Sequence, residues 1–175
     1  MTDRELIVSA LAGDVEAFGQ LVVKHQRAAY GHAVALLGQP EQAQDAVQDS
    51  FLAAFRALNR LDPERPFFPW FYVILRNRCF SMLRSRRATQ PLGDSYAMVT
   101  DGSTNEEAAE IRRALSRLSA EDREILVLKY IDGLRYREIA EMLDIPVATV
   151  TSRLYAARRR LAARLPNVRM SEAGT

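Results

Sequence analysis

Apolar residues recur every three or four positions along most of this chain, and the strict alternation of a half-buried strand is scarce. The pattern predicts an all-α protein. In the N-terminal half it predicts helices over residues 14–37, 40–58 and 70–87. Asp14 suits the N-cap of the first helix and Gly38 suits its end. Residues 59–69 contain three prolines and are expected to form a loop.

The second of these predicted helices has two distinct faces. Its apolar stripe, which we expect to be buried, consists of Val47, Phe51, Phe55 and Leu58. The opposite face carries Asp45, Gln48, Asp49 and Leu52. One side of this helix is therefore expected to pack into a core, while the other remains available to a partner.

The C-terminal half begins after a change in composition. Residues 88–105 are rich in Thr, Gly, Ser and Asp without periodicity, and predict a flexible linker. A helix is expected over residues 106–118, and Ser119 suits the cap of the next helix, which Gly133 ends. The predicted fold class is all-α, with two small helical domains, residues 1–87 and 106–165, joined by the linker. The polar tail, residues 166–175, is expected to be disordered.

Residues 134–161 predict a helix-turn-helix. Asp144 stands at the turn, where it tolerates the left-handed conformation, and Pro146 suits the first turn of the second helix. The apolar positions that fit one small core are Ile139, Ala140, Leu143, Ile145, Val150, Leu154, Ala157 and Leu161. The opposite face of the second helix carries Thr149, Ser152, Arg153, Ala156, Arg159 and Arg160. This cationic, hydroxyl-rich face favours DNA binding over the alternative, an ordinary helical hairpin with a solvated arginine face.

Charge is concentrated in two blocks, although the net charge of the chain is only +2. Residues 59–90 carry seven basic and two acidic side chains, and residues 123–175 carry ten and six. All but two of the 24 cations are arginines, the exceptions being Lys24 and Lys129. Because the planar guanidinium group suits phosphates and base edges, nucleic acid is the expected partner.

The first basic block interleaves aromatic and cationic residues on a predicted helix. One side carries Phe71, Leu75, Cys79 and Met82, whereas the other carries Trp70, Asn77, Ser81 and Arg84. The Asn77 amide, flanked by Arg76 and Arg78, is placed to bind an exposed base edge while the arginines hold phosphates. Phe67 and Phe68, on the loop before the helix, are expected to stack on unpaired bases. The alternative is that all the aromatic residues belong to the core, which we favour for Phe71 and Tyr72.

The expected cellular location of the protein rests on two sequence features that are not seen, a transmembrane span and a signal peptide. No apolar run approaches the length of a transmembrane helix, and the acidic start lacks the basic residues of a signal peptide. We therefore expect a cytosolic protein without membrane insertion. The single cysteine, Cys79, cannot form an internal disulfide, and its helical spacing with Phe71 and Leu75 favours a core role.

Two DNA-directed helical modules in this order resemble the minimal sigma factors of the extracytoplasmic-function (ECF) group of the sigma-70 family. Residues 43–52 resemble the helix that docks on core RNA polymerase, residues 69–78 the segment that reads the −10 element, and residues 118–161 the domain that reads −35. The resemblance implies that Asn77 helps to capture a flipped base at −10 and that the preceding loop, residues 59–68, shapes specificity. It also implies core RNA polymerase, promoter DNA and an anti-sigma factor as partners, with no cofactor.

Contacts are expected from three sets of residues. The −10 set consists of Phe67, Phe68, Trp70, Arg76, Asn77, Arg78, Ser81 and Arg84. The −35 set consists of Thr149, Thr151, Ser152, Arg153, Tyr155, Ala156, Arg159 and Arg160. The polymerase set consists of Asp45, Gln48, Asp49 and Leu52.

The chain departs from the family pattern at three positions. Relatives often carry arginine where this chain has Thr151 and Ala156, so a typical −35 sequence is not expected. Arg135 stands where a capping Ser or Thr is common, which weakens the predicted start of the first helix of the helix-turn-helix.

Two other classes of protein remain as alternatives. A conventional helix-turn-helix regulator would bind a palindromic duplex by itself as a dimer. An enzyme such as a nuclease would need a catalytic or metal centre. His25 and His32 are seven residues apart on one predicted helix, but the sequence offers no convincing third ligand, so neither catalytic residues nor a metal site are predicted.

Overall fold

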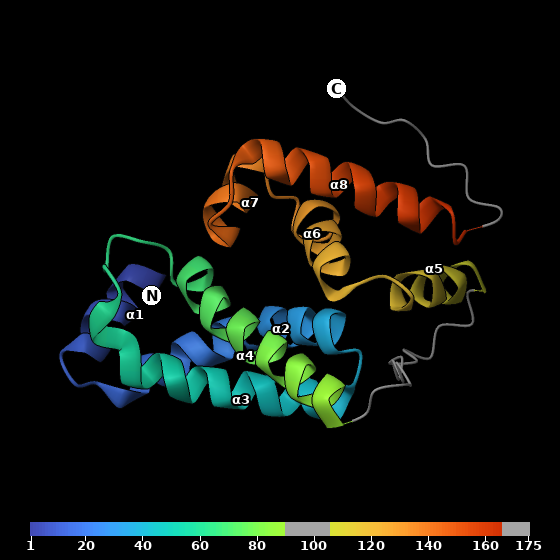
Figure 1. Cartoon of the computed structure of the whole chain (residues 1–175). Coiled ribbons are helices and arrows are strands. Elements are labelled where there is room, and N and C mark those ends of the chain that lie inside the picture. The colour runs from blue at the N-terminus through green and yellow to red at the C-terminus, as the bar shows by residue number, and fades with distance from the viewer. Residues whose placement is uncertain (90–105, 166–175) are drawn as a thin grey trace. The chain divides into compact units, whose positions relative to one another are not determined.

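The computed structural model describes residues 1–89 and 106–165, and every regular element in these ranges is a helix (Figure 1). The chain divides into two compact units, Met1–Ala97 and Met98–Thr175. The all-α prediction with two helical domains is confirmed. Most of the predicted linker and the whole predicted tail lie outside the described residues.

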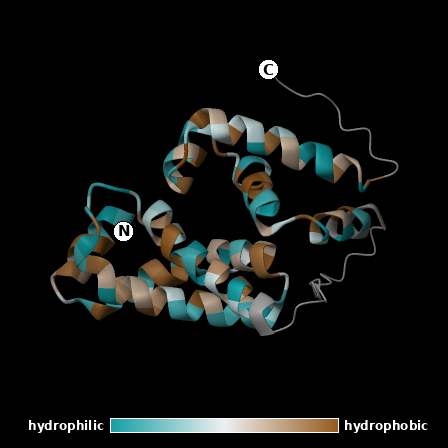
Figure 2. Cartoon of the chain, viewed as in Figure 1, coloured by the Kyte–Doolittle hydropathy of each residue, from teal (hydrophilic) through white to brown (hydrophobic). Residues whose placement is uncertain are grey.

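The described part of the N-terminal unit, residues 1–89, contains four α-helices and one short 3-10 helix. They are α1 (Asp3–Leu11), α2 (Val15–Leu37), α3 (Pro40–Ala57), η1 (Leu58–Arg60) and α4 (Phe67–Thr89). Helix α2 packs against α1, α3 and α4, and α3 also packs against α4. Figure 2 shows hydrophobic and hydrophilic residues alternating along these helices, as expected where each helix buries one face.

The caps predicted for α2 are confirmed. The Asp14 carboxylate accepts hydrogen bonds from the backbone N–H groups of Glu16 and Ala17, 3.0 and 3.2 Å away. Gly38 ends the helix with φ 70°, a left-handed conformation that glycine adopts without strain.

Helix α1 was not predicted from the sequence, although its start carries a local signal. The Thr2 hydroxyl accepts from the Glu5 N–H at 3.3 Å, and the Glu5 carboxylate accepts from the Thr2 N–H at 2.8 Å. This reciprocal pair is a capping box, and its spacing is readable in the sequence.

Two predictions for this unit are corrected in part by the structure. Helix α4 begins at Phe67 and runs to Thr89, so the loop is shorter than expected and the first two residues of the predicted linker are helical. The predicted apolar stripe of α3 is confirmed at Phe51 and Leu58, which are buried, but Val47 is half-buried and Phe55 is 42% exposed. The face that α3 buries is formed by Phe51 together with four small side chains, Ala43, Ala46, Ser50 and Ala54. Small residues let α3 lie close to its neighbours, which leaves the bulkier Phe55 at the edge.

The C-terminal unit is built from α5 (Glu106–Ser116), α6 (Ala120–Tyr130), α7 (Tyr136–Leu143) and α8 (Val147–Ala162). Helices α7 and α8 form the predicted helix-turn-helix, and both pack against α6. The side chains of Ile139, Val150 and Ala157 are fully buried in the core of this unit. Asp144 adopts the expected left-handed conformation at the turn, with φ 52°.

Candidate nucleic-acid interface

Helix α4 separates its core residues sharply from its polar residues. Phe71, Tyr72, Leu75 and Cys79 are completely buried, so their predicted core roles are confirmed. The Phe71 ring stacks on Phe51 with a centroid distance of 4.2 Å, which anchors α4 on α3. The exposed residues of the predicted −10 set are Asn77, Arg78 and Arg84, whereas Trp70, Arg76 and Ser81 are half-buried.

The prediction that Phe67 stacks on DNA bases is wrong. Phe67 does not lie on a loop but begins α4, and its side chain has no exposed surface. Its ring contacts those of Phe18, His25 and Phe71, with centroid distances of 6.3, 5.3 and 5.7 Å. A residue held in this way cannot reach a base unless the domain unfolds locally. Phe68 also lies in the first turn of α4 and is half-buried.

The two arginines that flank Asn77 differ in their surroundings. The Arg76 guanidinium lies over the Phe80 ring, 4.6 Å from its centroid. Arg78 Nη2 donates to Asp49 Oδ2 at 2.7 Å, and both side chains remain almost half exposed. Helix α3, which carries the polymerase set, is therefore tied to the −10 face of α4 by an ion pair.

The polymerase set lies on the solvent side of α3. Asp45, Gln48 and Asp49 are exposed, and Leu52 is an exposed apolar residue with half its surface accessible. An exposed leucine among polar residues is compatible with a protein contact. The assignment to polymerase stays a prediction.

The exposed face of α8 carries most of the predicted −35 set. The exposed members are Thr151, Ser152, Arg153, Tyr155, Arg159 and Arg160, whereas Thr149 and Ala156 are half-buried. The Arg159 guanidinium lies 5.8 Å from the centroid of the Tyr155 ring, so these two side chains form one surface.

Two hydroxyl groups of α8 are bound to their own helix backbone. Thr151 donates to the Val147 carbonyl and Ser152 to the Thr149 carbonyl, both at 3.1 Å. Since each hydroxyl has one proton, the oxygens retain only acceptor capacity. In this rotamer Ser152 can accept from an amino group on a base edge but cannot donate to a base.

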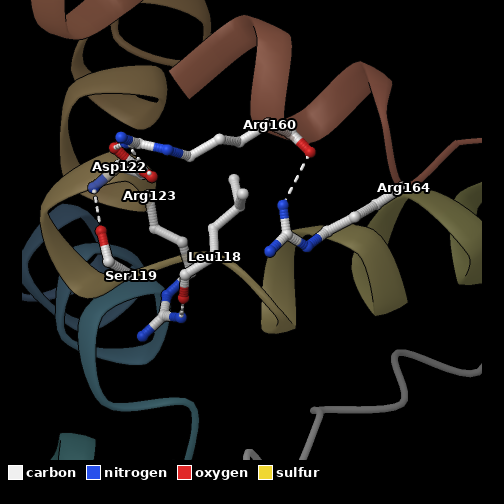
Figure 3. Close-up of polar contacts among 6 residues, drawn as sticks. All are labelled: Leu118, Ser119, Asp122, Arg123, Arg160 and Arg164. Atoms are coloured by element: carbon white, nitrogen blue, oxygen red, sulfur yellow. Dashed lines mark hydrogen bonds and ion pairs between the residues drawn. The ribbon is translucent and has the colours of Figure 1, made fainter. Parts of the chain in front are cut away.

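Arg160, which is predicted to contact −35 DNA, is 57% exposed but also forms an ion pair within the C-terminal unit. Its Nη1 donates to both carboxylate oxygens of Asp122 in α6, at 2.8 and 2.9 Å (Figure 3). The Asp122 side chain is only 9% exposed. The backbone N–H of Asp122 also donates to the hydroxyl of Ser119, the predicted N-cap of α6, at 3.1 Å. Arg160 therefore joins α8 to the start of α6.

Other polar contacts brace the same corner of the unit. Arg164 Nη1 donates to the Arg160 carbonyl at 2.8 Å, and the guanidinium of Arg123 donates to the Leu118 carbonyl (Figure 3). At the start of α7, Arg135 provides no side-chain cap, as its chemistry requires. Its backbone N–H instead donates to the Glu138 carboxylate at 2.6 Å, so half of a capping box remains.

The two histidines of α2 are part of the packing. His25 Nε2 lies 2.9 Å from Asp3 Oδ2, and its ring stacks on Phe67 and Phe68. His32 is buried against Phe68 and Tyr72. Within residues 1–89 and 106–165, no three His, Cys, Asp or Glu side chains converge to hold a metal ion. In the same ranges, no helix is both long and apolar enough to cross a membrane.

Comparison with known proteins agrees with this arrangement. The family model described as sigma-70 region 2 matches residues 21–89, and the one described as sigma-70 region 4 matches residues 108–161. The chain is 35% identical to the RNA polymerase sigma factor CnrH of Cupriavidus metallidurans, over 93% of this chain and 94% of CnrH. It is also 35% identical to the ECF RNA polymerase sigma factor SigM of Mycobacterium tuberculosis, over 92% of this chain and 83% of SigM.

Solved structures show the same fold. A structure of CnrH in complex with the cytosolic domain of CnrY aligns with a TM-score of 0.69 at 34% identity, covering 92% of this chain and 95% of that chain. The sigma factor RpoE of Bartonella quintana, in complex with the anti-sigma factor NepR, aligns with a TM-score of 0.71 at 26% identity, covering 87% and 98%.

The fold and the two matched regions define a sigma-70 transcription factor, a class that is not a family of catalytic enzymes. Within this class the chain belongs to the ECF group of alternative sigma factors. The comparisons give no support to the alternative of a dimeric helix-turn-helix regulator.

Proposed function

We propose that this ECF sigma factor reads a promoter at two places while bound to core RNA polymerase. Helix α8 binds the −35 element as duplex, and the exposed face of α4 around Asn77 captures unpaired bases at −10. Residues 1–87 then serve polymerase binding and −10 recognition, residues 88–105 connect the two units, and residues 106–165 serve −35 recognition. The chain itself catalyses no reaction, and it acts in the cytoplasm, where its polymerase acts.

The proposal for −10 rests on the division of α4 into a buried face and an exposed face. Five residues along one side of this helix are completely buried, so the helix cannot rotate to present another face. They are Phe67, Phe71, Tyr72, Leu75 and Cys79. Asn77 stands exposed between two arginines, with an amide that can both donate to and accept from a base edge. Unstacking a base costs a few kcal/mol, which a base pocket and phosphate contacts offset. In this proposal the promoter duplex melts at −10 because the protein captures a base that has left the stack.

At −35 we propose that the DNA-reading face of α8 is smaller than the sequence predicts, because Arg160 is bound to Asp122. Arg153 and Arg159 remain exposed for phosphates or base edges, and Ser152 offers an acceptor to an amino group of cytosine or adenine. Each base contact of this kind contributes about 1–3 kcal/mol to discrimination. With threonine and alanine at positions 151 and 156, the preferred −35 sequence differs from that of arginine-bearing relatives.

The partners follow from the family and from its solved complexes. CnrH is bound to CnrY and RpoE to the anti-sigma factor NepR in their structures. We propose that an anti-sigma factor likewise holds this chain inactive, and that the exposed side of α3 with Asp45, Gln48, Asp49 and Leu52 binds core polymerase.

Transcription in vitro with purified core polymerase and a promoter library tests the proposal. The chain should direct initiation from a subset of promoters that share one upstream and one downstream element, with no transcript from core polymerase alone. A gel shift with the free protein is the complementary measurement. Tight binding to a palindromic duplex that polymerase does not change would overturn the proposal in favour of a regulator.

A further inference from the structure

Helix α1 is connected to the start of α4 through one histidine of α2. His25 Nε2 lies 2.9 Å from Oδ2 of Asp3, and because an ionised carboxylate only accepts, the imidazole N–H donates. The other carboxylate oxygen, Oδ1, lies 2.6 Å from Lys24 Nζ. The His25 side chain is 14% exposed and that of Asp3 is 24% exposed, so water screens this contact only in part.

The His25 ring supports the first turn of α4. It stacks on Phe67 and on Phe68, with centroid distances of 5.3 and 5.7 Å and an interplanar angle of 29° in both cases. Because Asp3 holds one edge of the imidazole, the ring has a fixed orientation against both phenyl groups. The position of the α4 N-terminus therefore depends on a contact made by α1.

A second contact from α1 reaches the loop before α4. Arg4 Nη2 and Nε lie 2.6 and 2.8 Å from Glu64 Oε1. The loop is otherwise held at its two ends, where Leu61 and Phe67 are buried. Within it the Asp62 carboxylate accepts from the Glu64 N–H at 3.0 Å, which orders the turn that carries Glu64.

We propose that Asp3 and His25 are positioning residues for −10 recognition, holding residues 61–66 and the first turn of α4 in the geometry that selects the captured base. The inference rests on the proposed function, because it concerns the face that reads −10. Neither residue is assigned a contact with DNA. Substitutions at such positions change coupling by about 2- to 30-fold, so a change of this size in −10 base preference is expected.

The test uses holoenzyme assembled from core polymerase and the full chain. Transcripts are counted from a promoter library randomised at −10 with the −35 element held constant, and from a second library randomised at −35. The variants are Asp3→Ala, His25→Phe, which keeps an aromatic ring, and the double variant. Lys24→Gln is the matched control, because it removes the other partner of Asp3 and leaves His25 in place. Thermal unfolding of each variant sets an assay temperature below its transition.

Each single variant should change the ratio of transcripts from promoters with the best and the second-best −10 base. The double variant should change this ratio no further than either single variant does. The preference at −35 should stay constant in all of them. Arg4→Glu should shift the same ratio, and the charge-exchanged pair Arg4→Glu with Glu64→Arg should restore it. Three results would overturn the inference and leave the proposed function standing. The first is an active variant with an unchanged −10 ratio, the second is a double variant in which the two single effects add, and the third is an equal change of the ratio in Lys24→Gln. No transcripts with the wild-type chain would instead refute the proposed function, and the inference with it.

Discussion

Replacing Arg160 by methionine should destabilise the C-terminal unit without weakening the contact with −35 DNA. The guanidinium of Arg160 is bound to both oxygens of Asp122, whose side chain is 9% exposed. Methionine replaces the aliphatic stem of the arginine but removes the donors, so the Asp122 carboxylate loses its charged partner. The matched variant is Arg159→Met. Arg159 is the exposed neighbour of Arg160, and its guanidinium lies over the Tyr155 ring.

The expected magnitude follows from the geometry and exposure of the pair. A hydrogen bond to a charged group contributes about 1.5–3 kcal/mol, whereas a fully exposed ion pair contributes about 0–1 kcal/mol. Arg160 is 57% exposed while Asp122 is nearly buried, so the loss should be about 1–2 kcal/mol. For a domain of this size that corresponds to a fall in Tm of about 4–16 °C. Arg159→Met should leave Tm unchanged.

Two measurements on the full chain separate the roles of these arginines. Thermal unfolding is followed by circular dichroism, with hydrogen exchange of α6 and α8 amides to assign the transition to the C-terminal unit. Binding of the holoenzyme to −35 duplex is measured across a series of salt concentrations. Arg159→Met should reduce the magnitude of the salt slope by about one, and Arg160→Met should leave the slope unchanged. An unchanged Tm together with a reduced slope in Arg160→Met would refute the reasoning, since Arg160 would then be a phosphate contact.

Three further predictions concern the N-terminal unit. Asn77→Ala should slow open-complex formation, measured by fluorescence of a base analogue at −10, and leave polymerase binding intact; a loss of polymerase binding would instead make Asn77 a structural residue. Phe67→Ala should lower the free energy of unfolding by about 3–5 kcal/mol in a denaturant titration, because the ring is fully buried, and a stable variant with weaker DNA capture would contradict its core role. Burial alone would raise the pKa of Asp3, but Lys24 and His25 together lower it. Asp3 therefore contributes stability above its unfolded pKa, and this stability is lost as pH falls through the lower folded pKa. Wild type should therefore lose more stability than Asp3→Asn between about pH 5 and pH 3, and parallel acid curves would contradict this.

Local sequence signals predict the helices and the helix-turn-helix well. Asp14, Gly38 and Ser119 each act on backbone groups within four residues, so their roles as caps are visible without a fold. The same holds for Asp144, whose positive φ is a property of one residue and its turn. The capping box of Thr2 and Glu5 belongs to this class as well, and reading it would have predicted α1.

The buried face of α4 was also determined by the sequence, because Phe71, Leu75 and Cys79 follow the helical period. The tertiary structure determined the contacts between helices, which helical periodicity does not predict. Phe67 is buried because α2 supplies rings from outside its own helix, and Arg160 is bound to α6 because the fold brings Asp122 to it from 38 positions away in the chain. The physical reason is that caps and amphipathic faces depend on neighbours in sequence, whereas ring stacks and ion pairs between helices depend on which elements the fold places in contact.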